Sequence, residues 1–274
     1  MGRKSIFEKM GELDLKHEIT ILRRLLTSKA ISLNGYRTIE EDVNYWNYIP
    51  SWKNNYRCIN CNDIRNKLNI YYIETNVYPE VEDILTYLEY IANMMYLIER
   101  DTTRTKILNL DYHTLKRNIN SLVADLNHEI KLIESEERIL IVELNPTATA
   151  VADIVDEDLG IKIIRYNHYL MKGELEIKRD VLLSLADKFE SIKSELKNYS
   201  QTAVVDKAGF LLNNMNIRHN NLEGTEKKEF TANMSGEELE EWYDTTYDVL
   251  LLAILTHDYI KNVKPKIENL QDHY

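Results

Sequence analysis

Apolar side chains recur every three or four residues over most of the chain, the spacing that places them on one face of an α-helix. The most regular stretch follows Gly173 and comprises Ile177, Val181, Leu182, Leu185, Phe189, Ile192 and Leu196. Comparable faces predict helices over residues 5–30, 79–98, 112–144, 151–170 and 202–217. The pattern therefore indicates a protein made largely of long helices.

Two helix boundaries are specified by local residue types. Asn145 and Pro146 end one helix and can begin the next, with the asparagine as N-cap and the proline in the first turn. The last long helix begins at Ser235, which forms a capping-box pattern with Glu238. The segment ILIVEL, residues 139–144, also fits a β-strand, but a helix is favoured because the apolar face of the preceding residues runs straight into it.

Regular spacing is lost between residues 32 and 78, which contain an aromatic run at residues 45–52 and a CxxC pair. We expect irregular, aromatic-rich structure here, with short helices near residues 38–45 and 62–72. The chain then divides into an N-terminal part, residues 1–78, and a helical bundle, residues 79–274. The two parts can also form one continuous domain.

Composition supports helices over strands. The chain has only eight glycines and four prolines in 274 residues. A β-sandwich or barrel would need turn residues of this kind about every 8–12 positions. We therefore predict an all-α fold, and a multi-helix bundle is the natural way to bury the apolar stripes.

Charge limits the kind of partner. The net charge is −11 and the isoelectric point is near 5.2, which disfavours a protein whose main task is to coat nucleic acid. The N-terminus lacks the continuous apolar segment of a signal peptide. No run approaches the roughly 18 apolar residues that indicate a membrane span. We expect a soluble, cytoplasmic protein.

The two cysteines, Cys58 and Cys61, form a lone CxxC motif. Two thiolates at this spacing can hold half of a zinc site, but no second CxxC or HxxxH pair is present to complete it. Two reduced cysteines are the simpler interpretation, and no metal or cofactor is expected. The aromatic run at residues 45–52 fits either a surface for stacking bases or packing beneath a loop, and packing is favoured because few basic residues are interleaved.

Two further polar groupings lie on predicted helical faces. One is Arg65 with Asn66, and the other is Arg165 with His168, which share a face because they are three residues apart. The second pair fits contact with RNA, but an ordinary surface pair is the simpler interpretation.

The segment NNMNIRHNNLEG, residues 213–224, is unlike the rest of the chain. It holds five asparagines in its first nine residues and places Arg218 beside His219. A structural interpretation is available, because cations in the last turn complement the helix dipole and asparagine tolerates the left-handed conformation that ends helices. On this interpretation the segment is simply the end of a helix.

A functional interpretation starts from the concentration of polar groups in this segment. Arg218 supplies a fixed charge, His219 supplies an imidazole, and Asn214, Asn220 and Asn221 supply amides. A histidine can take the 2′-hydroxyl proton of RNA, and an arginine can neutralise the charge that develops on the phosphate. We therefore predict catalytic roles for the arginine and histidine and substrate binding by the three asparagines, without a metal.

An all-α domain with an arginine-polar motif before its last long helix resembles HEPN domains. These helical bundles occur in abortive-infection, toxin–antitoxin and CRISPR-associated ribonucleases. Their motif is an arginine, a polar residue, and a histidine four to six positions after the arginine. Arg218 and His219 match the first two elements, whereas Leu222, Glu223 and Gly224 occupy the positions of the histidine. The resemblance covers about the last 100 residues and implies a homodimer with two facing motifs.

Two functions from different classes follow. The first is a HEPN-like protein of bacterial antiviral defence that cleaves RNA without a metal. The second is a non-catalytic helical interaction or regulatory module of a defence or toxin–antitoxin system, which binds a protein partner. A ligand-binding bundle is a third interpretation, but the chain has no glycine-rich phosphate loop.

Overall fold

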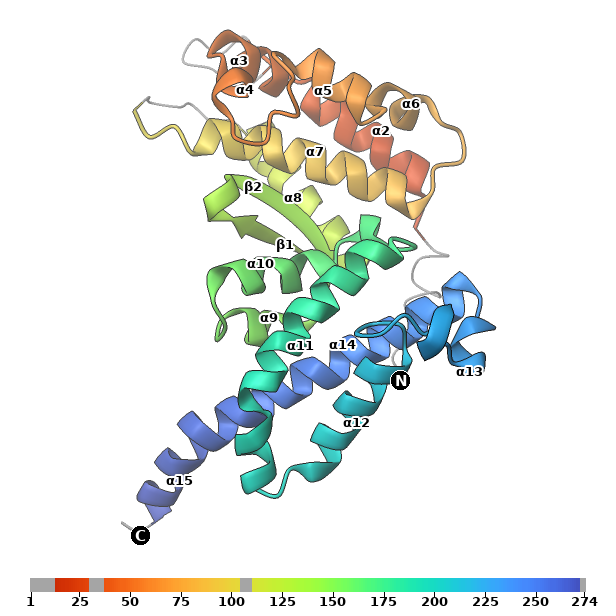
Figure 1. Cartoon of the computed structure of the whole chain (residues 1–274). Coiled ribbons are helices and arrows are strands. Elements are labelled where there is room, and N and C mark those ends of the chain that lie inside the picture. The colour runs from red at the N-terminus through yellow and green to blue at the C-terminus, as the bar shows by residue number, and fades with distance from the viewer. Residues whose placement is uncertain (1–12, 30–36, 104–109, 272–274) are drawn as a thin grey trace, which may run out of the picture. The chain divides into compact units, whose positions relative to one another are not determined.

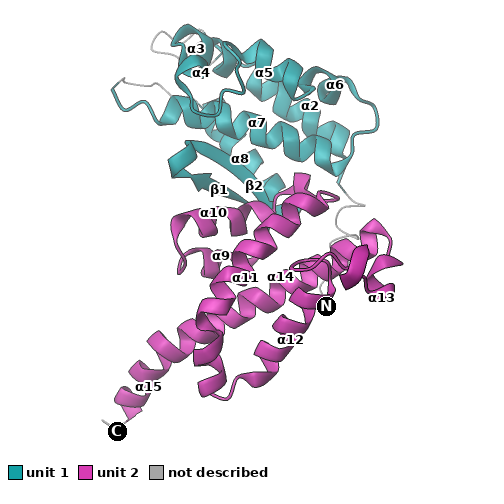
Figure 2. Cartoon of the chain, viewed as in Figure 1, with its two compact units in different colours: residues 1–144 teal, residues 145–274 magenta. Residues whose placement is uncertain are grey.

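The computed structural model describes residues 13–29, 37–103 and 110–271. The chain forms two compact units, residues 1–144 and residues 145–274 (Figure 2). Both are built mainly of helices (Figure 1), so the predicted all-α, multi-helix class is confirmed, with one small two-stranded sheet added. No helix in the described ranges combines the length and apolar character needed to cross a membrane.

The division between the units lies after Leu144, whereas the sequence suggested a boundary after residue 78. The reason is the packing of α7, Val81–Glu99, which contacts α2, α3 and α6 from the N-terminal region. This helix is apolar on most sides, and 13 of its residues are buried. A helix of that kind needs neighbours all round, and it joins residues 79–144 to the segment before them.

Helix α2, Leu15–Leu26, begins at Asp14, whose side chain accepts a hydrogen bond from the backbone N–H of His17. Its buried residues are Ile19, Leu22 and Leu26, at the predicted spacing. The helix is therefore confirmed over these residues, and residues 5–12 and 30 of the predicted helix lie outside the described part of the chain.

The region expected to be irregular contains four short helices: α3, Ile39–Tyr45; α4, Tyr48–Ser51; α5, Cys61–Lys67; and α6, Ile70–Thr75. The helix predicted over residues 62–72 is interrupted at Asn69, which has a positive φ of 55°. Asn47, with φ 54°, separates α3 from α4 in the same way. Asparagine adopts this conformation more readily than most residues, so these two positions break the region into short pieces.

Part of the aromatic run packs inward. Trp52 is buried and donates its indole N–H to the carbonyl of Glu137 at 2.6 Å. Tyr48 is also buried and donates its hydroxyl to Asp101 at 2.7 Å. Buried Trp and Tyr normally have such a polar partner, which agrees with the packing interpretation for these two residues.

The helix predicted over residues 112–144 is wrong beyond α8, Leu110–Asp125. A hairpin follows, with β1, His128–Ile133, paired antiparallel to β2, Arg138–Glu143. The alternative strand interpretation of ILIVEL is thus correct for residues 139–143. Left-handed residues stand before each strand, at Asn127 (φ 60°) and Glu137 (φ 53°). They end the helix and turn the hairpin, and the Ile-rich strands have side chains that favour β-structure.

Helix α7 covers the outer edge of β2 with two polar side chains. Asn93 accepts the N–H of Ile139 and donates to its carbonyl, both at 2.9 Å. One turn earlier, Glu89 accepts the N–H of Ile141 at 2.9 Å and pairs with Arg138 at 2.9 Å. The two side chains take the place of a third strand, because they supply the partners that an edge strand otherwise lacks.

The second unit contains α9, Pro146–Ala152; α10, Glu157–Tyr166; α11, Leu175–Asn198; α12, Thr202–Asn214; α13, Glu229–Ala232; α14, Gly236–Asp258; a π-helical turn, Tyr259–Val263; and α15, Lys264–Gln271. Asn145 caps α9 as predicted and accepts the N–H of Ala148 at 3.0 Å. The helix predicted over residues 151–170 is instead two, because Asp156 caps α10 by accepting the N–H of Leu159.

Helices α11 and α14 share the main apolar core of this unit, and α12 packs beside α14. The capping box at the start of α14 is confirmed: Ser235 accepts the N–H of Glu238 at 3.1 Å, and the glutamate accepts that of Ser235 at 2.8 Å. A buried lysine links the two helices. Lys178 of α11 pairs with Glu240 at 2.8 Å and Asp244 at 2.7 Å on α14.

Candidate functional site

The segment singled out by the sequence forms the end of α12 and the loop that follows it. The helix stops at Asn214, three residues before the predicted end at residue 217. Met215 and Ile217 are buried in the core, and Asn216 between them has a positive φ of 54°. The backbone N–H of Arg218 then donates to the carbonyl of Leu212 at 3.1 Å. The loop is thus anchored by two apolar side chains and closed onto the helix end.

Asn221 is the centre of this loop and is fully buried. Its side-chain oxygen accepts the N–H of Asn216 at 2.8 Å, and its own N–H donates to the Asn216 side chain at 3.1 Å. Its amide nitrogen donates to the carbonyl of Glu226 at 3.1 Å, and its carbonyl accepts the N–H of Lys228 at 2.8 Å. Every polar group of this residue therefore bonds within the loop and holds it together.

The other two asparagines predicted to bind substrate also contact the backbone. The side-chain oxygen of Asn220 accepts the N–H groups of Leu222 at 3.2 Å and Glu223 at 3.1 Å. The amide nitrogen of Asn214 donates to the carbonyl of Phe210, one turn earlier in α12, at 2.7 Å. Local bonds of this kind are typical of asparagine at turns and helix ends.

Arg218 forms an ion pair with Glu190 of α11, with 2.7 Å between Nη2 and Oε1. The arginine side chain is 23% exposed, and the carboxylate also contacts Lys193 at 3.2 Å. Partial burial acts to raise the pKa of Glu190, but the hydrogen bonds from Arg218 and Lys193 outweigh it. The pKa of this carboxyl is therefore below its ordinary value, as expected for a carboxylate between two cations.

His219 contacts a different carboxylate. Its Nδ1 lies 2.9 Å from Oε1 of Glu226 in the same loop, and both side chains are about half exposed. A carboxylate on one ring nitrogen orients the imidazole and leaves Nε2 facing away from that contact. The loop therefore holds Arg218 and His219 close in sequence, but each is paired with its own glutamate.

Two residues that the sequence did not single out fasten the loop to the bundle. Arg179 of α11 donates its Nε–H to the carbonyl of Asn216 at 2.7 Å. Tyr243 of α14 donates its hydroxyl to the same carbonyl at 3.3 Å. No local signal marks either residue, because their role arises only when α11 and α14 pack against the end of α12.

We expect the Arg218→Ala substitution to raise the pKa of Glu190 towards its ordinary value of 4.5. A lowered pKa means that the ion pair stabilises the fold above the ordinary pKa and that this contribution is lost as the pH falls through the lowered value. The wild type should therefore lose its advantage over the variant in acid, below about pH 4.5, and the advantage should stay below about 1 kcal/mol because the pair is partly exposed. Carbon-detected NMR titration of Glu190, with Arg24→Ala as the control, would check this. An unchanged pKa would contradict the pairing.

The CxxC motif is packed into the first unit. Cys58 and Cys61 are both buried and free of disulfides. The Sγ of Cys61 lies 3.8 Å from the Sδ of Met94 and 3.6 Å from the carbonyl of Glu40. Burial raises the pKa of both thiols, which makes them poor nucleophiles and poor metal ligands. Within the described ranges no group of three His, Cys, Asp or Glu side chains could hold a metal ion.

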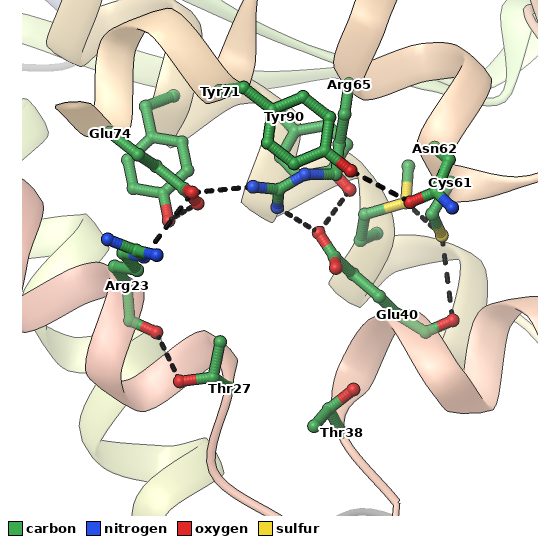
Figure 3. Close-up of polar contacts among 12 residues, drawn as sticks. Arg23, Thr27, Thr38, Glu40, Cys61, Asn62, Arg65, Tyr71, Glu74 and Tyr90 are labelled. Atoms are coloured by element: carbon green, nitrogen blue, oxygen red, sulfur yellow. Dashed lines mark hydrogen bonds and ion pairs between the residues drawn. The ribbon is translucent and has the colours of Figure 1, made fainter. Parts of the chain in front are cut away.

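A buried cluster of charges in the first unit was not expected (Figure 3). Arg65 of α5 lies between two carboxylates, with Nη1 at 2.7 Å from Glu40 of α3 and Nη2 at 2.6 Å from Glu74 of α6. Two tyrosines of α7 complete what we call the Arg65 cluster: Tyr90 donates to Glu40 at 2.5 Å, and Tyr87 donates to Glu74 at 2.8 Å. The cluster joins three short helices to α7.

The Arg65 cluster is structural in character. The arginine and Glu74 side chains are only 7% and 4% exposed, so their charges are removed from water and neutralised by each other. Desolvation and the neighbouring carboxylates raise the pKa of Tyr87 and Tyr90, which keeps both hydroxyls protonated as donors. The sequence places Arg65 on a helical face, but only the arrangement of four helices shows that this face is buried.

The predicted surface pair of Arg165 and His168 is only half correct. Arg165 is exposed, but His168 is 7% exposed and thus buried. Its Nδ1 accepts the backbone N–H of Leu170 at 3.3 Å, which caps a short helical turn after α10. Sharing a helical face predicts that two side chains are neighbours and does not predict their exposure.

Comparison with known proteins gave no match to a family model, to a curated protein or to a solved structure.

Proposed function

We propose that this chain is a non-catalytic helical interaction or regulatory module, of the kind used in bacterial defence and toxin–antitoxin systems. The observation that carries the proposal is the use of the polar groups in residues 214–221. The three asparagines satisfy backbone groups of the loop and of α12, and the arginine is paired with Glu190. The defence setting comes from the resemblance to HEPN domains.

Charge around the loop supports binding of protein over cleavage of RNA. The charge of Arg218 is already partly neutralised by Glu190, and His219 lies against a second carboxylate, Glu226. Glu223 adds another negative charge to the same loop, and the whole chain has a net charge of −11. The carboxylates of Glu190 and Glu226 repel a phosphate that approaches Arg218 and His219, which weakens its attraction to these two side chains.

A metal-independent endoribonuclease is the second candidate, and one observation favours it. The contact between Nδ1 of His219 and Glu226, at 2.9 Å, orients an exposed imidazole beside an arginine. An oriented histidine is suited to general acid–base catalysis. An adjacent cation can stabilise the negative charge that develops on the phosphate in a phosphorane-like transition state. For this candidate, the substrate would have to displace Glu190 from Arg218 and Glu226 from His219.

One experiment separates the two candidates. The wild type and Arg218→Ala/His219→Ala are incubated with total RNA in excess chelator, and both are used as bait in the native host. For an interaction module we expect no cleavage above a blank and capture of one protein in stoichiometric amounts by the wild type. Arg24→Ala serves as a matched control, because Arg24 is an exposed arginine of α2. Cleavage that the double substitution abolishes would overturn the proposal in favour of the nuclease.

A further inference from the structure

The two strands of the first unit differ in how their outer edges are used. The outer edge of β2 is covered, because Asn93 and Glu89 of α7 bond its outward N–H groups. Strand β1 lies on the other side of β2 from α7 (Figure 1). Its outer edge is therefore the place where a further strand can be added to this sheet.

The register of the hairpin shows which backbone groups of β1 point outward. In an antiparallel pair, successive residues direct their N–H and C=O groups alternately towards the partner strand and away from it. Ile139 and Ile141 of β2 point towards α7, so the residues that face them across the hairpin, Leu132 and Ile130, point away from β2.

These outward groups of β1 are open. In the part of the chain that the structure describes, no group bonds the backbone N–H or C=O of Ile130 and Leu132. The Leu132 side chain is 44% exposed, so solvent reaches this edge. An extended strand placed there would find directional hydrogen-bond partners already in position.

Two charged residues of opposite sign flank Ile130 in β1. Glu129 and Lys131 point to the same face of the strand, and their carboxylate and ammonium groups lie 2.8 Å apart. If a second copy of β1 pairs antiparallel about Ile130, each glutamate lies directly opposite the lysine of the other copy. Side chains at such positions are close neighbours. The four charges then alternate in sign, and the two isoleucines face each other.

Charge also excludes the neighbouring registers. A pairing centred on Glu129 puts two glutamates directly opposite each other, and a pairing centred on Lys131 does the same with two lysines. Like charges at these positions destabilise a strand pair. A lysine normally protects a short edge strand from pairing, and here it is matched in the register centred on Ile130. The edge is therefore complementary to a second copy of itself.

We propose that two copies of this chain pair through the outer edges of β1, antiparallel about Ile130, and form one four-stranded sheet. Each copy contributes the same edge, as an isologous dimer requires. The inference goes beyond the proposed function, because it concerns the first unit and not the loop at residues 214–221. A single strand pair is at the small end of specific interfaces, so we expect a dissociation constant of about 10–100 µM.

Sedimentation equilibrium of the full chain, from about 1 to 500 µM, tests the dimer. The wild type should pass from monomer to dimer. Ile130→Pro should weaken the dimer by roughly 30-fold, because proline lacks the N–H and its ring occupies the outer edge. Since this N–H points away from β2, the hairpin keeps its own bonds. Ile130→Ala is the matched control, because it shortens the same side chain and keeps the N–H, and it should weaken the dimer by less than about fivefold. Circular dichroism of both variants should match the wild type.

Charge reversal tests the register. Glu129→Lys and Lys131→Glu should each weaken self-pairing by roughly tenfold, because all four facing charges become alike. A mixture of these two variants should form a dimer of different chains, because opposite charges face each other again. Glu129→Lys/Lys131→Glu in one chain restores the alternation and should pair as the wild type does.

Hydrogen exchange locates the contact. A rise in protein concentration should slow the exchange of the Ile130 and Leu132 amides, which point outward. The Lys131 amide points towards β2 and should be protected at every concentration, so it is the internal control.

Three results would overturn the pairing. They are a wild type that stays monomeric throughout, an Ile130→Pro chain that dimerises as tightly as Ile130→Ala, and a mixture of the charge-reversed chains that pairs no better than either chain alone. None of them bears on the proposed function. Capture of a host protein and cleavage of RNA are compared between the wild type and the Arg218→Ala/His219→Ala chain, and both keep β1 unchanged.

Discussion

Replacing Arg65 with alanine is expected to lower the free energy of unfolding of the first unit by about 3–5 kcal/mol. The guanidinium neutralises Glu40 and Glu74, and the Glu74 side chain is 4% exposed. Without it, Glu40 keeps only the hydroxyl of Tyr90, and Glu74 keeps the hydroxyl of Tyr87 and the partly exposed Arg23 at 3.4 Å. Removal of one partner from a buried ion pair is costly because the remaining charge is left uncompensated.

The measurement is urea unfolding followed by tryptophan fluorescence. Trp46 and Trp52 lie in the first unit and Trp242 in the second. A Trp242→Phe background therefore reports the fluorescence of the first unit alone. Arg24→Ala, an exposed arginine of α2, should change stability by less than about 0.5 kcal/mol. Arg65→Lys should lie between the two, because an ammonium cannot form the same pair of contacts. Equal effects of the Arg65 and Arg24 substitutions would show that the cluster does not stabilise the unit.

Replacing Asn221 with alanine is expected to destabilise the second unit by about 2–4 kcal/mol, since it removes both bonds of a fully buried amide. The N–H of Asn216 and the carbonyl of Glu226 would lose their partners at 2.8 Å and 3.1 Å. The loop would still be held by its backbone bonds, by Arg179 and Tyr243 and by its buried apolar side chains, but it would lack its central polar contacts.

Asn220→Ala is the matched control, because Asn220 is exposed and its bonds to two N–H groups can be replaced by water. It should cost less than about 1 kcal/mol. Denaturant unfolding followed by Trp242 gives the stabilities, and hydrogen exchange at Asn216 shows whether the loop has opened. A smaller effect for Asn221 than for Asn220 would contradict the assigned role of the buried amide.

The structure shows which parts of the fold the sequence could predict. Helix starts were predictable, because Asn145 and Ser235 cap the helix that begins directly after them. The hairpin was missed because Ile, Leu and Val at residues 139–142 fit an apolar helical face and a strand equally well. Whether residues 139–142 form a helix or a strand depended on the left-handed turns at Asn127 and Glu137. It also depended on α7, which supplies hydrogen-bond partners for β2.

The candidate site shows the same limit. The end of α12 near the asparagines was predictable, because the chain there needs a left-handed residue and Asn216 supplies it. The partners of Arg218 and Asn221 were not, since Glu190 comes from a separate helix and the contacts of Asn221 depend on how the loop folds back. The burial of Arg65 could likewise not be predicted from the sequence, because its partners come from α3 and α6.

The way α7 covers β2 has a consequence for refolding. Residues 139–142 are an uncharged, β-prone run, and such a run seeds intermolecular sheets when its edge is open. In the folded unit, Asn93 and Glu89 occupy the outer N–H groups of this strand. Any state in which α7 has separated but the hairpin persists would present a ready template to another chain. Aggregation during unfolding of the first unit is therefore governed by how long α7 stays in place.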